Sequence, residues 1–270
     1  MPLRSIAIAT ILAALLLTHP ARAAAPLPSF HVDLGQTTVS GLSSGAFMAL
    51  QFHVAFSATV QGAGIIAGGP FYCAQGQLAL ALNRCMRTNL GTPDPAALLV
   101  VARTVAGQGH LDPLANLKDD RAYLFTGRAD ATVAAAVVEA TRQFYLLAGL
   151  PAENLAYVSD LPAGHALLTE DEGNACASSD PPFLNDCDYD QAGAILQQLY
   201  PDLGPAAARP NGRLIAFDQS EFFRAGEATA GVGGSWPWGA WRSLMSGVDR
   251  PLGLNDVGYV YVPSACAEGS

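Results

Sequence analysis

The chain has 270 residues, of which 50% are hydrophobic and 14% are charged, and its formal net charge is −9. This length and apolar content suit one large α/β domain or at most two small ones. An acidic chain without a cluster of lysine and arginine residues argues against a nucleic-acid partner.

The first segment is typical of an export signal. Arg4 precedes the apolar run 6–17, and small residues follow at Ala21 and Ala23. The run is too short to span a bilayer, so a membrane anchor is the less favoured alternative, and no later segment has the length of a transmembrane helix. We therefore predict a signal peptide over residues 1–23, a single domain over 24–270, and a secreted protein, extracellular or periplasmic.

Beyond this signal, strand-like and helix-like segments alternate along the chain. Short segments rich in β-branched or buried apolar residues predict strands over 36–40, 62–69, 121–127 and 153–160. Longer apolar segments predict helices over 46–56, 95–106, 132–149 and 190–200, the first of them buried on all sides. This alternation predicts an α/β fold with a mostly parallel sheet flanked by helices. Two further strands are expected over 212–220 and 258–266, with no helix between them.

A serine motif lies between the first strand and the first helix. The pentapeptide Gly41-Leu42-Ser43-Ser44-Gly45 matches G-x-S-x-G, which in α/β-hydrolases forms the sharp turn that exposes a nucleophilic serine. Small residues at Gly41 and Gly45 would let strand and helix approach each other. We predict Ser43 as nucleophile and the backbone N–H of Ser44 as one oxyanion donor, since the helix N-terminus points its free N–H groups at the reacting oxygen.

A serine nucleophile requires a histidine base and a carboxylate that orients the base. Of the histidines, His165 follows the fourth strand, whereas His53 lies on the helix after Ser43 and is expected to point away from it. Asp130 follows the third strand and matches the chain order serine, acid, histidine. Helix capping is an alternative role for Asp130, and Asp160, directly after the fourth strand, is a rival acid. The aspartates before the third strand are expected to be solvated, namely Asp112, Asp119 and Asp120.

The cysteines favour local disulfides. Two pairs are close in sequence, and we predict the disulfides Cys73–Cys85 and Cys176–Cys187, each closing a loop in an oxidising compartment. Cys266 has no partner by this reasoning, and an odd cysteine in an exported protein indicates a missing partner or a reactive thiol.

Several segments together resemble one family. The stretches SGLSSGAFMALQ, AGGPFYCAQG, LFTGRADATV, PAGHALLT, NDCDYDQAGAILQQLY and GYVYVPSACA are similar, in this order, to the extracellular poly(3-hydroxybutyrate) depolymerases with an N-terminal lipase box. The resemblance implies a circularly permuted α/β-hydrolase fold and a serine esterase that cleaves polyhydroxyalkanoates. It also places the serine, aspartate and histidine of the triad on Ser43, Asp130 and His165.

The resemblance also implies a departure from the family. Family members continue beyond the YVPSAC segment with strands that supply a second oxyanion donor and a cysteine partner for Cys266. We therefore expect the C-terminal strands of the fold to be incomplete and the strand before Ser43 to have an unpaired edge. An open edge of this kind invites aggregation.

The substrate is less constrained than the chemistry. Trp236, Trp238 and Trp241 could form an apolar surface that binds a polyester, although local packing of their loop explains them equally well. A polyester or an oligomeric hydroxyalkanoate ester is the expected substrate. A carboxylesterase acting on a feruloyl or acetyl ester, and a non-catalytic remnant, are the alternatives. The sequence contains no metal-ligand spacing or phosphate loop, so we predict no cofactor and no metal.

Overall fold

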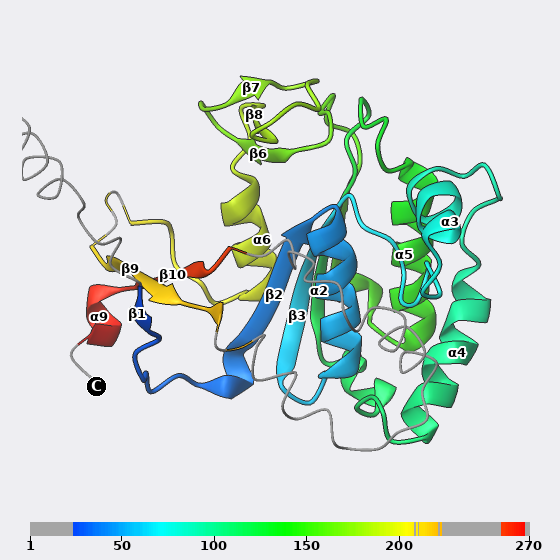
Figure 1. Cartoon of the computed structure of the whole chain (residues 1–270), viewed down its shortest axis with the longest axis horizontal. Coiled ribbons are helices and arrows are strands. Elements are labelled where there is room, and N and C mark those ends of the chain that lie inside the picture. Colours follow the sequence, from blue (N-terminus) through cyan, green and yellow to red (C-terminus); the bar gives the residue numbers. More distant parts are fainter. Residues whose placement is uncertain (1–23, 208, 210, 221, 223–254, 268–270) are drawn as a thin grey trace, which may run out of the picture. The chain divides into compact units, whose positions relative to one another are not determined.

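The computed structural model describes residues 24–207, 209, 211–220, 222 and 255–267 (Figure 1). The chain divides into two compact units, one comprising residues 32–206 and the other residues 1–31 with 207–270. The predicted signal peptide and the tryptophans Trp236, Trp238 and Trp241 lie outside the described residues.

A parallel sheet forms the centre of the 32–206 unit. Its strands lie in the order β2 (Thr37–Leu42), β3 (Val60–Ile66), β4 (Arg121–Phe125) and β5 (Leu155–Val158), and each pairs in parallel with its neighbours. The sheet follows the predicted strand segments to within a few residues. Within the described residues β2 has one partner, β3, so its other edge is unpaired. This α/β sheet confirms the predicted fold class, while the circular permutation and the incomplete C-terminal strands stay predictions.

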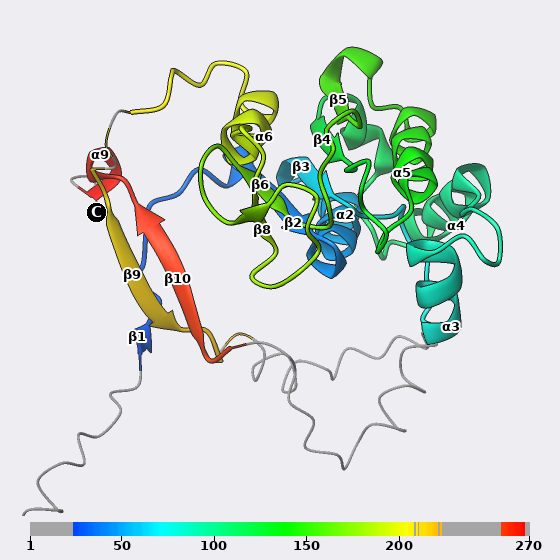
Figure 2. The same cartoon turned by 90° about the horizontal axis from the view of Figure 1, so that it is seen from above.

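Helices cover both faces of this sheet, so consecutive residues of its central strands β3 and β4 are buried. Along β4, Ala122 and Leu124 belong to the core under the helices α2 (Ser44–Ala55), α4 (Pro95–Gly107) and α5 (Ala135–Ala148). The alternate residues Tyr123 and Phe125 belong to a second core under α6 (Gln191–Leu199). Figure 2 shows α6 and α5 on opposite sides of the strands.

The helix ends follow local chemistry. Asp94 caps α4 because its side chain accepts hydrogen bonds from the N–H groups of Ala96 and Ala97, and Pro95 occupies the first helical position. Gly149 ends α5 in the left-handed conformation, with φ of 108°. Asp190 caps α6 through the N–H of Gly193. Short helical turns complete the unit: η1 (Leu34–Gln36), α3 (Leu78–Leu80), the π-helical η2 (Ala81–Met86), η3 (Leu114–Lys118) and η4 (Ala152–Asn154).

Helix α2 differs from its prediction. Its inner residues are buried, but Met48 and Phe52, with Phe56 directly after the helix, form an exposed stripe, with 65%, 43% and 50% of their surface accessible. The segment is apolar at nearly every position, which predicted burial on every side. In the described part of the chain, the helix is covered on its sheet-facing side only.

A small second sheet was not predicted from the sequence. The strands β6 (Leu167–Thr169), β8 (Leu184–Asp186) and β7 (Asn174–Ala175) pair in parallel in this order. They are too short to give a strand signal, and β7 and β8 also contain Asn or Asp. The predicted disulfides Cys73–Cys85 and Cys176–Cys187 are both formed, and the second of them joins the loop after β7 to the end of β8.

The other unit contains a three-stranded sheet with the order β1 (Ala25–Pro26), β9 (Arg213–Asp218) and β10 (Val257–Val262), followed by the short helix α9 (Ser264–Ala267). Strands β9 and β10 are antiparallel and match the two predicted C-terminal strands. Cys266 is exposed and forms no disulfide with another described cysteine. Across the described ranges, no helix is long and apolar enough to cross a membrane.

Candidate active site

Ser43 lies at a sharp corner between β2 and α2. Its backbone has φ of 58° and ψ of −122°, a conformation that residues with a side chain rarely adopt. The corner is fixed on both sides: the Ser43 N–H donates to the carbonyl of Ile66, 2.9 Å away, and the Ser43 carbonyl accepts the N–H of Phe47 at 3.0 Å. The surrounding hydrogen bonds therefore hold a strained serine, as expected at a functional turn.

The two glycines of the motif have different roles. A Cβ atom added to Gly41 would stand 2.5 Å from the carbonyl oxygen of Gly45 and 2.8 Å from the N of Ala46, which are backbone atoms. A Cβ atom on Gly45 would meet nothing within 4 Å among the described residues. The close approach of strand and helix therefore requires glycine at position 41. Among the described residues no contact requires glycine at position 45, so the prediction that Gly45 contributes to this approach is wrong.

Ser44 begins helix α2, where the first N–H groups lack partners inside the helix. Its N–H is adjacent to the Ser43 hydroxyl in sequence, and the partial positive charge of the helix N-terminus lies at the same place. The local structure is thus compatible with the predicted oxyanion donor, which stays a prediction.

Asp130 and His165 meet in space. The Nδ1 atom of His165 lies 2.8 Å from Oδ2 of Asp130, and the side chains are 6% and 1% exposed. A carboxylate only accepts hydrogen bonds, so Nδ1 carries the proton, and in the neutral imidazole Nε2 is then the acceptor. This is the tautomer that a general base requires.

The second oxygen of Asp130 fixes the carboxylate. Oδ1 accepts hydrogen bonds from the N–H groups of Thr132 at 2.8 Å and Val133 at 3.0 Å. Asp130 therefore contacts His165 and also orders the turn before α5, but it does not cap the helix, which begins at Ala135. Oδ1 bonds to the two backbone N–H groups and Oδ2 to His165, so the carboxylate cannot rotate without losing hydrogen bonds.

The acid and base loops are tied to each other. The N–H of Ala129 donates to the carbonyl of Ala163 at 3.0 Å, and the N–H of Arg128 donates to that of Leu161 at 2.9 Å. Gly127 allows this approach, since a Cβ atom there would collide with the carbonyl of Ala163. The Asp130–His165 contact is thus built into the backbone.

Ser43 shares an edge of the sheet with this pair. Ser43 follows β2, Asp130 follows β4 and His165 follows β5, and these strands are parallel. Residues at the carboxyl ends of parallel strands lie along one edge of the sheet, where α/β proteins bind ligands. Within the described part of the chain no hydrogen bond joins the Ser43 hydroxyl to His165. Catalytic hydrogen bonds often tighten only when substrate binds.

A groove of about 410 Å³ runs beside the Ser43 corner. Its lining comes from β2, the end of β3, β6 and α6, and is mostly apolar: Ser40, Gly41, Leu42, Ile66, Leu167, Ala192, Ile195 and Leu196. Leu42 directly precedes Ser43 in the chain, although Ser43 itself is not among the lining residues. Such a site suits an apolar acyl segment better than a charged ligand.

The other histidine and aspartates considered from the sequence lie outside this pair. His53 is fully buried, and its Nδ1 and Nε2 each lie 2.9 Å from a partner, the hydroxyl of Tyr145 and Oδ2 of Asp120. Asp120 is therefore buried, and the prediction that it is solvated is wrong. Burial raises the pKa of the Tyr145 hydroxyl, and the nearby charge of Asp120 raises it by a smaller amount. The rival acid Asp160 is exposed.

The His53–Asp120–Tyr145 network was missed because its members come from three segments far apart in the sequence. The only signal was a histidine on an otherwise apolar helix, which usually needs a buried polar partner. No cluster of histidine, cysteine and carboxylate side chains that could hold a metal ion is present among the described residues.

Comparison with known proteins decides the family. No protein-family model matches the chain. A poly(3-hydroxybutyrate) depolymerase of Delftia acidovorans is 42% identical over 92% of this chain and 45% of its own length. A polyhydroxybutyrate depolymerase of Talaromyces funiculosus is 31% identical over 92% of this chain and 65% of its own length. The chain belongs to the poly(3-hydroxybutyrate) depolymerase family.

Solved structures agree with this assignment. The crystal structure of PHB depolymerase from Penicillium funiculosum matches with a TM-score of 0.71 and 29% identity, over 91% of this chain and 68% of that one. A serine-to-alanine variant of PHB depolymerase complexed with an R3HB trimer matches equally well. The family predicted from the sequence is thus confirmed. The chain spans about half to two thirds of the length of the curated relatives that it matches.

Proposed function

We propose that this depolymerase-family chain is a serine esterase that hydrolyses the ester bonds of poly(3-hydroxybutyrate) or its oligomers. The observation that carries the proposal is the buried 2.8 Å hydrogen bond from His165 to Asp130. It lies at the sheet edge where Ser43 occupies a strained corner. This arrangement supplies the base and orienting acid that a serine nucleophile requires.

The chemistry follows from these residues. Nε2 of His165 takes the proton of the Ser43 hydroxyl as Oγ attacks the ester carbonyl, and Asp130 stabilises the imidazolium that forms. The N–H of Ser44 donates to the oxyanion of the tetrahedral intermediate. Collapse expels the alcohol end of the chain, which receives the proton from His165, and leaves an acyl-enzyme on Ser43. Water, activated by His165, then releases the hydroxy acid.

The proposed substrate rests on the relatives and on the groove beside Ser43. Both curated relatives are named as depolymerases of this polyester, and one solved neighbour is a complex with an R3HB trimer. The apolar groove next to Leu42 would accept a short acyl unit. We keep Trp236, Trp238 and Trp241 as proposed contacts with a polymer surface. Oligomers in solution need no such surface.

We also propose that the protein acts outside the cytoplasm. Disulfides persist in oxidising compartments, and both Cys73–Cys85 and Cys176–Cys187 are formed. The segment 1–23 fits an export signal, as the sequence predicts. Recovery of the protein from the periplasm or the culture medium, with its N-terminus at residue 24, is the expected result. Retention in the cytoplasm with residues 1–23 attached would contradict this.

Two measurements test the proposed activity. Release of 3-hydroxybutyrate from polymer films, and from soluble trimers, separates this substrate from a feruloyl or acetyl ester. Labelling by a fluorophosphonate probe separates an active esterase from a remnant, since the probe reacts with an activated serine only. The Ser43→Ala variant is the control, and equal labelling of this variant and of the wild type would refute the role of Ser43.

A further inference from the structure

The loop that carries His165 is held by a neighbouring disulfide-closed loop. The N–H of His165 donates to Oγ of Ser179 at 2.9 Å, and the N–H of Gly164 donates to the carbonyl of Cys176 at 2.8 Å. Two residues further on, the N–H of Leu167 donates to the carbonyl of Phe183 at 2.9 Å. All three acceptors belong to the segment 176–187, whose ends are joined by the disulfide.

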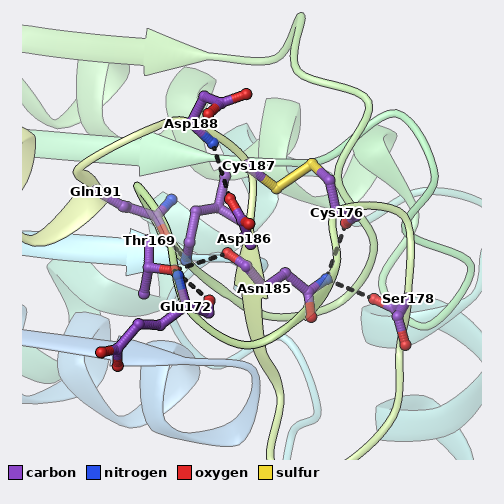
Figure 3. Close-up of a disulfide and its surroundings, with 10 residues drawn as sticks. Thr169, Glu172, Cys176, Ser178, Asn185, Asp186, Cys187, Asp188 and Gln191 are labelled. Carbon is purple, nitrogen blue, oxygen red and sulfur yellow. Dashed lines mark hydrogen bonds between the residues drawn. A yellow bond between two sulfur atoms is a disulfide. The ribbon is translucent and has the colours of Figure 1, made fainter.

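One buried side chain organises this segment from inside. Asn185, which is fully buried on β8, donates both hydrogens of its Nδ2 group, one to the carbonyl of Cys176 and one to that of Ser178, each at 2.8 Å. Figure 3 shows the Asn185 amide pointing at both carbonyls, beside the disulfide of Cys176 and Cys187. The carbonyl of Cys176 therefore receives two hydrogen bonds, one from Asn185 and one from Gly164.

The contact is close enough to transmit a displacement. A Cβ atom on Gly164 would collide with the carbonyl of Ser178, so the two loops touch backbone to backbone. The ring of Phe183 stands edge-on to the His165 ring, with centroids 6.5 Å apart. Since interiors are close-packed, a shift of segment 176–187 moves the backbone of residues 164 and 165.

We propose that Asn185 and the Cys176–Cys187 disulfide form a clamp that positions His165 for its reaction. Asn185 touches neither substrate nor Ser43 in this scheme, so it is a positioning residue and acts through the acceptors of segment 176–179. The disulfide keeps β8, which carries Asn185, next to those acceptors. The proposal deepens the proposed function and rests on it, because it assigns a determinant to the same histidine.

The test compares the full chain with two variants of the clamp, Asn185→Asp and Cys176→Ser/Cys187→Ser. Asn185→Asp keeps the size of the side chain, but it removes both donated hydrogens and puts a carboxylate against two carbonyl oxygens. We expect kcat for p-nitrophenyl butyrate to fall about 100-fold, since displacement of a catalytic group by 1 Å has an effect of that size. KM should change much less than kcat, because Asn185 does not line the groove beside Ser43 and that groove meets segment 176–187 through Leu167.

The Cys73→Ser/Cys85→Ser variant is the matched control. It also removes a native disulfide from a loop of similar length, with a sequence separation of 12 against 11, but that loop makes none of the hydrogen bonds described for residues 164–167. It should lower the melting temperature and leave kcat within about twofold. An equal loss of kcat in the control and in the clamp variants would show a merely structural role and overturn the proposal.

A spectroscopic measurement keeps the test independent of the esterase assay. The proton between Nδ1 of His165 and Asp130 should give a low-field proton resonance, which the clamp variants shift or lose by exchange with water. A wild type without esterase activity would refute the proposed function but not the clamp. The clamp itself would be refuted by a resonance that is unchanged in Asn185→Asp. If Asn185→Asp does not fold, Ser179→Ala removes the acceptor of the His165 N–H alone. It should lower kcat about tenfold, and unchanged kcat would refute the clamp.

Discussion

Replacement of Gly41 by alanine is the sharpest test of the Ser43 corner. The added Cβ atom would stand 2.5 Å from the carbonyl oxygen of Gly45, whereas ordinary contact begins at 3.4 Å. Strand β2 and the first turn of α2 must therefore separate by about 1 Å, since the atoms involved are backbone atoms and no side chain can rotate away. Ser43 lies between them and moves with the helix.

The magnitude follows from this displacement. A shift of about 1 Å at a catalytic group typically costs about 100-fold in rate, so fluorophosphonate labelling of Gly41→Ala should slow by about this factor. The overpacking should also reduce the free energy of unfolding by about 1–3 kcal/mol. A time course of quenched labelling reactions, read by mass spectrometry, measures the labelling rate. Urea denaturation measures the free energy of unfolding.

Gly45→Ala is the matched control in the same motif. Its Cβ atom meets nothing within 4 Å among the described residues, and alanine favours a helix over glycine. Labelling should therefore stay within a few-fold of the wild type, and stability should rise by up to about 1 kcal/mol. Equal labelling of Gly41→Ala and the wild type, or an equal loss in both variants, would refute the reasoning from strand–helix contact.

The strain at Ser43, the tautomer of His165 and the buried partner of His53 can each be tested by one substitution. Ser43→Gly should unfold at a higher temperature than Ser43→Ala, because glycine relieves a strained corner that costs about 1–3 kcal/mol; equal melting temperatures in calorimetry would show that the corner is unstrained. Asp130→Asn should lower kcat by about 10⁴-fold, because an amide favours the wrong tautomer of His165, and a loss below tenfold would exclude Asp130 as the orienting acid. Tyr145→Phe leaves Nδ1 of His53 without its partner and should cost about 1–3 kcal/mol near neutral pH. Burial raises the pKa of Tyr145 above its usual 10.0, so the wild type loses stability as the pH rises above that value, and the variant should show a shallower loss in urea titrations.

The sequence by itself determined the order and type of the main elements. Apolar runs and β-branched segments gave β2 to β5 and α2, α4, α5 and α6 within a few residues, because secondary structure follows local periodicity. The two disulfides were also predicted correctly, since cysteines only 11 and 12 residues apart favour the closing of local loops. The strand–serine–helix order predicted the corner at Ser43, because only a sharp turn connects such elements through G-x-S-x-G.

The tertiary structure decided which side chains meet. The sequence placed Asp130 and His165 after successive strands. Their 2.8 Å contact joins two loops whose residues lie 35 positions apart in the chain, and only the packing of these loops brings the side chains together. It could not show that His53 pairs with Asp120 or that Asn185 braces the histidine loop, since these contacts join distant segments. Nor could it distinguish Gly41 from Gly45, because the motif treats them alike. Local patterns record backbone preference, whereas contacts between distant residues arise only when the chain packs.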